Sequence, residues 1–204
     1  GGFGQDGVYM PEYYYDKDNG RKVTKAGFVK DNRGLTYYLD EKGEKVLGLH
    51  EINGDLYYFR RGGAYKYTQL GDMWQDSINY IDGKIYYFGH DGRAIKNRFY
   101  QWGNYWYYFY ADGSAATGAV QINGQQLYFD KNHGRQVKGA FAPDGHYYDE
   151  NSGELVTNQT RTIKGVTYHF DENDNAMYSA YWIFGQSKGP KVLYKNSGDT
   201  FTLS

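Results

Sequence analysis

Two polar side chains on one short stretch offer most of the binding chemistry in the sequence. Gln136 and Lys138 are two residues apart, with Val137 between them. Residues two apart on an extended strand share a face, so the amide and the ammonium would point one way and Val137 the other. Glutamine can donate to one hydroxyl and accept from another, and lysine adds further donors. The pair therefore suits a ligand rich in hydroxyl groups.

Tyrosine rings could supply the flat apolar surface that such a ligand also needs. A pyranose has one face of C–H groups, and a rigid, amphipathic tyrosine ring can pack against it. Tyr128 lies on the aromatic run before Gln136, and Tyr147 comes from the next run. We expect these two rings, Gln136 and Lys138 to converge in one sugar-binding notch. A solvated strand face with ordinary packing tyrosines is the alternative interpretation.

Two further sets of residues follow the same arrangement with fewer polar groups. The second candidate site is Tyr87 with Lys96 and Tyr108, and the third is Tyr14 with Lys22 and Thr24. The corresponding stretches Lys45-Val-Leu47, Ala115-Ala-Thr117 and Leu155-Val-Thr157 lack the pair, so we expect only some of the repeats to bind.

The elements that must position these residues recur along the whole chain. Aromatic runs return about every 20 residues, a period at the short end of repeat architectures. They include Tyr13–Tyr15, Tyr37–Leu39, Tyr57–Phe59, Tyr86–Phe88, Tyr107–Phe109, Tyr128–Phe129, Tyr147–Tyr148 and Tyr168–Phe170. No window shows a convincing helical period with caps.

Turn residues flank each aromatic run. Asn-Gly and Asp-Gly, the favoured two-residue hairpin turns, precede several runs, and a polar turn ending in glycine follows most of them. Because a lone hairpin is marginally stable, neighbouring hairpins are expected to bury each other's aromatic faces. The sequence therefore predicts an all-β solenoid or superhelix of stacked β-hairpin repeats.

Two regions depart from the repeat. Arg60–Asn79 contains a longer step and Trp74, which predicts an insertion or a degenerate unit. Residues 181–204 lack the aromatic-turn-glycine pattern. We therefore expect a repeat array over residues 1–180, followed by a cap or the start of a further module over residues 181–204.

Composition excludes several classes of function. The chain has 204 residues, a net charge of −1 and no cysteine, so it has neither a basic field for nucleic acid or anionic lipid nor a disulfide framework. It has no apolar run long enough to span a bilayer. Its 25 tyrosines and 28 glycines suit thin, half-exposed sheets. Since no initiator methionine or signal peptide is visible, we interpret the chain as a segment of a longer protein.

One unit resembles a known family closely. The motif Ile-Asn-Gly-x-x-Leu-Tyr-Phe-Asp-x-x-x-Gly-x-Gln-Val-Lys-Gly-Ala over Ile122–Ala140 resembles the glucan-binding repeats of lactic-acid bacterial and streptococcal glucansucrases. Tyr147–Asn158 resembles the unit that often follows. The resemblance covers about residues 13–175, and it extends to a wider group of cell-wall-binding repeats that includes choline-binding modules and clostridial toxin repeats.

The resemblance implies a non-catalytic module with sugar pockets between hairpins, accessory to a secreted or cell-wall-associated enzyme that makes α-glucan from sucrose. The implied partner is dextran or an isomaltooligosaccharide, and we expect a monomer without cofactor, metal, nucleic-acid or membrane partner. A choline-binding, cell-wall-binding or toxin-type adhesive domain is the alternative. Choline-binding repeats usually carry Gly-Trp at the hairpin end, whereas the dipeptides here are Gly27-Phe28, Gly48-Leu49, Gly118-Ala119 and Gly139-Ala140.

Catalytic and metal chemistry find little support in the sequence. Most acidic residues, such as Asp16, Asp40, Asp130, Asp149 and Asp171, lie in turns, where an aspartate caps its own backbone. Neither of two acidic stretches has the glycine and glutamate that a calcium-binding loop requires. The five histidines have no ligand spacing.

Overall fold

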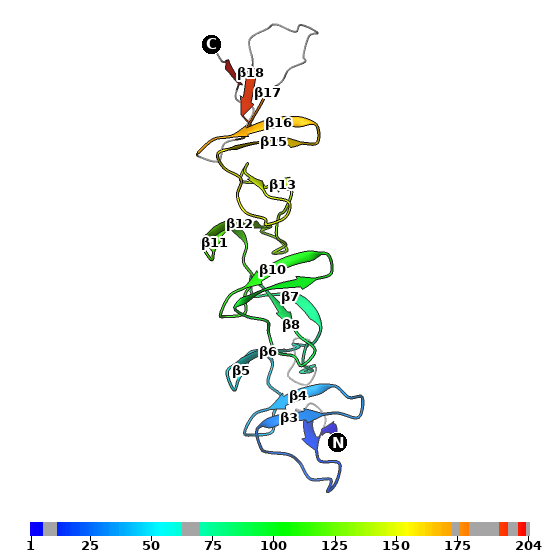
Figure 1. The fold of residues 1–204 in the computed structure, drawn as a ribbon. Helices are drawn as coiled ribbons and strands as arrows, with labels where there is room; N and C mark the ends of the chain where they lie inside the picture. The colour runs from blue at the N-terminus through cyan, green and yellow to red at the C-terminus, as the bar shows by residue number, and fades with distance from the viewer. Residues whose placement is uncertain (6–11, 63–69, 173–175, 180–191, 196–199, 203–204) are drawn as a thin grey trace. The chain divides into compact units, whose positions relative to one another are not determined.

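The chain folds as a succession of antiparallel β-hairpins. The computed structural model describes residues 1–5, 12–62, 70–172, 176–179, 192–195 and 200–202, and every regular element among them is a strand (Figure 1). None of these residues forms a helix that could cross a membrane. The predicted all-β architecture of hairpin repeats is confirmed.

Consecutive strands pair with each other. The hairpins are β1 (Gly2–Gln5) with β2 (Glu12–Tyr15), β3 (Gly27–Lys30) with β4 (Thr36–Leu39), β5 (Gly48–Ile52) with β6 (Asp55–Phe59), β7 (Ser77–Ile81) with β8 (Lys84–Phe88), β9 (Arg98–Trp102) with β10 (Tyr105–Phe109), β11 (Gly118–Ile122) with β12 (Gln125–Phe129), β13 (Ala140–Phe141) with β14 (Tyr147–Tyr148), and β15 (Gln159–Ile163) with β16 (Val166–Phe170).

Two-residue turns set the register of several hairpins. Asn53, Asp82, Asn123 and Lys164 have φ values of 53°, 49°, 52° and 49°, and the glycine after each also has a positive φ. Two successive positive φ values match the twist of the flanking strands, which is why asparagine and aspartate with glycine are favoured there. In β11 and β12 this turn pairs Ile122 with Gln125 and Gly118 with Phe129.

Aspartates organise the turn after several of the aromatic strands. The Asp16, Asp40, Asp130 and Asp149 carboxylates each accept a hydrogen bond from the backbone N–H two residues later, at 2.8, 2.8, 3.0 and 2.8 Å. These contacts confirm the predicted capping role of the four aspartates. The turn returns the chain to a single bridge on the aromatic strand, as between Phe129 and Gln136. Each repeat is thus a hairpin followed by a short third stretch.

Small clusters take the place of one large core. The last residue of most aromatic strands is fully buried, as at Phe59, Phe88 and Phe129. Each of these phenylalanines belongs to a different cluster. Phe59 packs with Ile52 and Tyr57, Phe88 with Ile81, Tyr86 and Ala94, and Phe129 with Ala116, Ile122 and Leu127. Two more clusters comprise Tyr128, Ala142 and Tyr148, and Tyr147, Val156 and Phe170.

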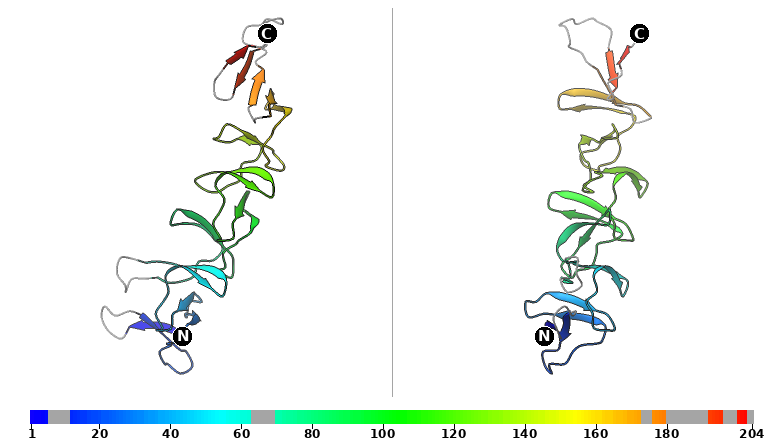
Figure 2. Two further views of the ribbon diagram at one scale, coloured as in Figure 1. Left: turned by 90° about the vertical axis from the view of Figure 1, so that its left-hand side faces the viewer. Right: turned by 180° about the vertical axis from the view of Figure 1, so that it is seen from behind.

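Contacts divide the chain into two compact units. The first unit comprises Gly1–Arg98 and Phe109–Ser114, and the second comprises Phe99–Tyr108 and Ala115–Ser204. Figure 2 shows the hairpins of each unit from two further sides. The two sites that the structure itself assembles, described below, each lie within one unit.

The long step after β6 is an enlarged turn in a regular repeat. Arg60 N–H donates to the Asp72 carbonyl at 2.9 Å, and the Arg60 guanidinium pairs with the Asp72 carboxylate at 2.7 Å. Met73 then bridges Phe59, as Ala94 bridges Phe88. The Trp74 ring packs 4.5 Å from the Tyr58 ring. The predicted insertion therefore lies between Arg60 and Asp72, and its residues 63–69 are outside the described part.

The last sheet continues past residue 180. β17 (Ala176–Ser179), β18 (Val192–Lys195) and β19 (Thr200–Thr202) extend the β15–β16 hairpin into one antiparallel sheet. Much of residues 181–204 lies outside the described residues. The division at residue 180, with a cap or a further module after it, remains a prediction.

Candidate functional site

The structure places Gln136 and Lys138 on one face, as the alternation of the strand predicts. Val137 packs on the opposite side, against the cluster of Tyr128, Ala142 and Tyr148. A Cβ added to Gly153 would overlap the Gln136 amide nitrogen and lie 3.3 Å from Lys138 Cε, so both side chains run past this glycine. The stretch is held by hydrogen bonds, since Gln136 N–H donates to the Trp106 carbonyl and Val137 N–H to the Tyr128 carbonyl, both at 2.8 Å.

Trp106 supplies the aromatic surface on this face. It lies on β10 of the same unit, is 38% exposed, and its ring centroid is 5.8 Å from Lys138 Nζ. Lys138 Nζ also donates to the Asn151 carbonyl at 3.1 Å. An exposed indole, an ammonium and an amide thus gather at one place. This group of Trp106, Gln136 and Lys138 is called the second-unit face below.

Tyr128 and Tyr147 do not join the second-unit face, which corrects the expected notch of four residues. Their side chains are only 2% and 4% exposed. The Tyr128 ring lies 5.6 Å from Tyr148, on the side of Val137, while Tyr147 packs against Phe170 in a different cluster. Burial raises the pKa of both phenols. The strand alternation that turns Gln136 away from Val137 also leaves Tyr128 on the buried side with Val137.

The second predicted set contains mostly structural side chains. Tyr87 is buried on β8 of the first unit, and Lys96 Nζ donates to the Gly54 carbonyl. Tyr108 belongs to the second unit, where its ring meets Phe99 edge-on at 4.9 Å. The described contacts give these three residues packing and cross-linking roles, and their part in binding remains a prediction.

The third predicted set pairs its lysine with a different tyrosine. Tyr14 is buried and its hydroxyl donates to the Lys30 carbonyl at 2.7 Å. Lys22 Nζ instead lies 3.1 Å from the centroid of the neighbouring Tyr13 ring, and Thr24 is exposed. Adjacent residues on a strand face opposite ways, so the ring beside Lys22 is Tyr13. A binding role for this set is likewise still only predicted.

The first unit contains a cavity that sequence reasoning missed. Its volume is about 500 Å³, and it is lined by Gly2, Phe3, Glu12, Asp31, Asn32, Arg33, Leu35, Tyr37, Lys45, Arg60, Leu70 and Asp72. We call it the first-unit cavity. Its residues come from β1, β2, β4 and the turn between β3 and β4, from the stretches that follow β4 and β6, and from residues 70–72. No spacing pattern connects such distant segments, so the cavity could not be predicted from the sequence.

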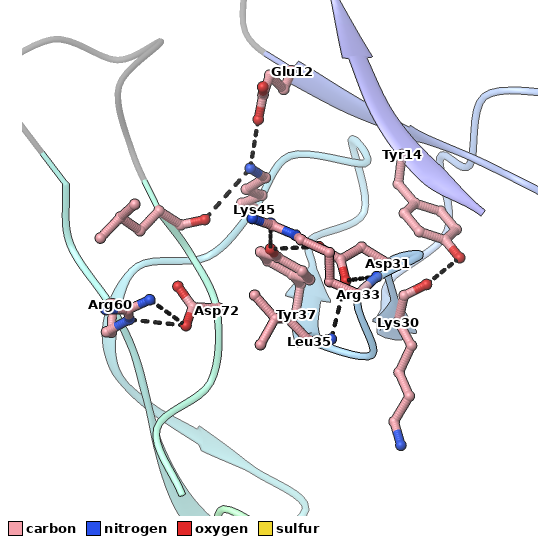
Figure 3. Close-up of polar contacts among 11 residues, drawn as sticks. Glu12, Tyr14, Lys30, Asp31, Arg33, Leu35, Tyr37, Lys45, Arg60 and Asp72 are labelled. Atoms are coloured by element: carbon pink, nitrogen blue, oxygen red, sulfur yellow. Dashed lines mark hydrogen bonds and ion pairs between the residues drawn. The ribbon is translucent and has the colours of Figure 1, made fainter.

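Tyr37 forms the fixed wall of the first-unit cavity (Figure 3). Its buried hydroxyl donates to Asp31 Oδ2 and accepts from an Arg33 NH2 group, both at 3.0 Å. Burial, followed by the hydrogen bond to Asp31, raises the pKa of Tyr37 to about 12. Burial acts to raise the pKa of Asp31 as well, but hydrogen bonds from Arg33, Leu35 and Tyr37 together lower it. Tyr37 is therefore neutral and Asp31 ionised near neutral pH.

Three ion pairs between described residues also line the first-unit cavity. Lys45 Nζ contacts Glu12 at 2.7 Å, Arg33 pairs with Asp31 at 2.8 Å, and Arg60 pairs with Asp72 at 2.7 Å. Each carboxylate among the described lining residues is thus paired with a cation. Among the residues that the structure describes, no three histidine or acidic side chains are grouped in a way that could hold a metal ion.

Comparison with known sequences identifies the repeat. The profile of the choline-binding repeat matches residues 116–159, and that of the putative cell wall binding repeat matches residues 26–45 and 97–115. Glucosyltransferase-S of Streptococcus mutans is 35% identical over 191 residues, and Glucosyltransferase-I of Streptococcus downei is 37% identical over 169 residues. The chain belongs to the cell-wall-binding repeats of the choline-binding type.

These repeats match a small part of the two relatives. The alignments cover 91% and 79% of this chain but only 12% and 10% of the respective glucosyltransferases. The matched profiles describe binding repeats and no catalytic domain. The predicted kinship with glucosyltransferase repeats is confirmed.

Solved structures share the hairpin architecture. One crystal structure of choline binding protein F from Streptococcus pneumoniae, determined in the presence of a peptidoglycan analogue, is 26% identical. It has a TM-score of 0.65 over 85% of this chain and 56% of that protein. A second crystal form is 30% identical, with a TM-score of 0.59 over 76% and 47% of the two chains.

Proposed function

We propose that this cell-wall-binding repeat chain binds α-glucan without turning it over, as an accessory part of a secreted glucosyltransferase. The observation that carries the proposal is the second-unit face, where the exposed Trp106 ring lies 5.8 Å from the Lys138 ammonium and the Gln136 amide runs past Gly153 beside the Lys138 side chain. The indole offers a platform for the C–H face of a glucosyl unit. The amide and the ammonium offer a donor-acceptor pair and further donors to its hydroxyls.

Sequence kinship supports a glucosyl polymer as the ligand. Both curated relatives are named for glucosyl transfer, and this chain matches only about a tenth of each. A binding segment in such an enzyme would hold the polymer that the enzyme extends. The same reasoning assigns the chain to the extracellular space and the catalytic step to another part of the protein.

Choline is the competing ligand class, since choline binding names one of the matching profiles and the similar crystal structures. A quaternary ammonium requires an aromatic surface free of other cations. On the second-unit face, Lys138 Nζ already lies near the Trp106 ring, and Lys22 Nζ lies over Tyr13 in the first unit. Both ammonium groups would repel a bound cation, so these two faces favour an uncharged ligand.

Affinity electrophoresis through dextran-containing gels, run beside a choline column, tests the proposal. The wild-type chain should be retarded by dextran and pass through the choline column. Affinity per site is expected between millimolar and micromolar, about −4 to −8 kcal/mol. Retention on choline without retardation by dextran would reverse the assignment of the ligand.

Variants locate the site. Gln136→Ala combined with Lys138→Ala, and separately Trp106→Ala, should abolish most of the retardation. The thermal midpoint of the double variant should change little, because both side chains are half-buried and neither belongs to a cluster of buried residues. Thr157→Ala is the matched control, at the position equivalent to Lys138 in a repeat without the pair. Full retardation of the folded double variant would place glucan binding elsewhere in the chain.

A further inference from the structure

A lysine ammonium lies inside an aromatic cage at the rim of the first-unit cavity. Lys45 Nζ is 4.0 Å from the Phe3 ring centroid and 5.2 Å from the Tyr37 ring centroid. It is also 2.7 Å from Glu12 Oε2 and 3.4 Å from the Leu70 carbonyl oxygen. Figure 3 shows the side chain reaching up between Tyr37 and Glu12. We call these groups, namely Phe3, Tyr37 and Glu12, the Lys45 cage.

Packing and hydrogen bonds hold the Lys45 cage in place. The Lys45 side chain is only 11% exposed. Its aliphatic stem passes against Gly71, where a Cβ would lie 2.8 Å from Lys45 Cδ, and Gly71 has a φ of 78°. The Phe3 and Tyr37 rings touch edge-on at 4.5 Å, which holds both in place. The Tyr37 hydroxyl is fixed in turn by Asp31 and Arg33.

Two aromatic rings with one carboxylate form the arrangement that recognises small organic cations. The negative faces of the rings attract an ammonium, and a carboxylate adds a direct ion pair. In this chain the cation comes from the protein itself. The space that a free quaternary ammonium would need is occupied by the end of the Lys45 side chain.

We infer that Lys45 determines which class of ligand the first-unit cavity accepts, because its ammonium fills a cage that would otherwise bind a small quaternary ammonium compound. The cavity beside the filled cage is left to uncharged, hydrogen-bonding ligands. The inference is independent of glucan binding at the second-unit face, since the two sites lie in different units. It predicts that shortening this one side chain converts the cavity into a site for an organic cation.

Titration with choline and with tetramethylammonium tests the inference. Calorimetry should detect no binding to the wild-type chain at millimolar concentrations, whereas Lys45→Ala should bind both cations with a millimolar dissociation constant. Choline at ten times that constant should raise the thermal midpoint of Lys45→Ala by about 3–6 °C. Adding Glu12→Gln to Lys45→Ala should weaken binding by about tenfold or more, because the ion pair is lost.

Two further variants distinguish the effect of the space that the Lys45 side chain fills from the effect of its charge. Lys45→Met removes the ammonium but keeps most of the stem, so it should leave the cage too full to bind choline. Lys22→Ala removes a lysine that also lies over a tyrosine ring but forms no ion pair with any residue that the structure describes, and it should create no choline site. Choline binding to wild type, or equal binding to Lys45→Ala and Lys22→Ala, would overturn the inference.

A measurement on the wild-type chain applies even if Lys45→Ala does not fold. Ring currents from Phe3 and Tyr37 should shift the εCH₂ protons of Lys45 upfield in the NMR spectrum. Added choline should leave that shift unchanged, since the cage is already filled. An unshifted Lys45 resonance, or one that moves as choline is added, would show that the ammonium does not occupy the cage.

Discussion

At the scale of single residues, Asp149 shows how a turn residue becomes a stabilising anion. Its carboxylate accepts hydrogen bonds from the Ser152 and Asn151 N–H groups at 2.7 and 2.8 Å, and from the Arg161 guanidinium at 2.6 Å. The Ser152 amide first, and then Arg161, hold the pKa of Asp149 well below its usual range. The ionised form is therefore favoured by folding.

This shift predicts a loss of stability in acid. A carboxyl whose folded pKa is lowered contributes its full stability above the unfolded pKa, which is about 3.9 for aspartate, and loses it as the pH falls toward the folded value. Asp149→Asn should lower the free energy of unfolding at pH 7 by about 2 kcal/mol. The variant should also lose less stability than wild type between about pH 5 and pH 2. Urea unfolding across this range measures both effects.

Asp91→Asn is the control for the acid experiment, because the Asp91 side chain is 63% exposed. It should change the free energy of unfolding by no more than about 0.5 kcal/mol at pH 7. If Asp149→Asn keeps the full pH dependence of wild type, the acid sensitivity of the chain originates elsewhere.

At the scale of elements, two equivalent glycines separate turn geometry from packing between repeats. Gly20 and Gly43 each end the polar turn after an aromatic strand, with φ values of 67° and 78°. A Cβ on Gly20 would meet nothing within 4 Å, whereas one on Gly43 would overlap the backbone carbonyl oxygen of Val23 in the preceding repeat. Only the second turn is therefore pressed against a neighbour.

This contrast predicts that replacing glycine by alanine reduces folding stability by different amounts at the two positions. Gly20→Ala should destabilise the chain by about 1 kcal/mol, the usual cost of a left-handed conformation for alanine. Gly43→Ala should cost about 3 kcal/mol or more, because backbone atoms of the preceding repeat must also move. Chemical denaturation of the two variants measures the difference. Equal costs would mean that the two repeats do not pack as closely as described.

At the scale of the whole molecule, the fold offers several small surfaces for binding instead of one deep site. In the described part of the chain, separate small clusters of buried residues support the hairpins, and lysine ammonium groups lie near aromatic rings in more than one place. A shallow protein face that binds one or two glucosyl units is weak by itself. A polymer that can return to one face or engage several gains avidity without any new contact.

Polymer length should therefore govern the apparent affinity. In competition with dextran-gel retardation, soluble dextran should act at a concentration of glucosyl units at least about tenfold lower than isomaltotriose does. The Gln136→Ala and Lys138→Ala double variant should lose most of this advantage. Equal potency of the polymer and the trisaccharide would indicate a single site that uses only a short segment of glucan.

The sequence by itself determined the features that depend on neighbouring residues. The period of the aromatic runs and the turns such as Asn123-Gly124 predicted the hairpins, because both follow from local backbone preferences. The shared face of Gln136 and Lys138, with Val137 turned inward, was also predictable, since side chains on a strand alternate.

Only the tertiary structure decided which partners these residues meet. Tyr128 was expected beside Gln136 but is buried with Val137, and the ring that adjoins Lys138 is Trp106, from an earlier hairpin. The Lys45 cage joins Phe3, Glu12 and Tyr37, which lie far apart in sequence. Alternation along a strand fixes which side a residue faces. Which residues it contacts on that side depends on how successive hairpins pack, and no local sequence pattern encodes that packing.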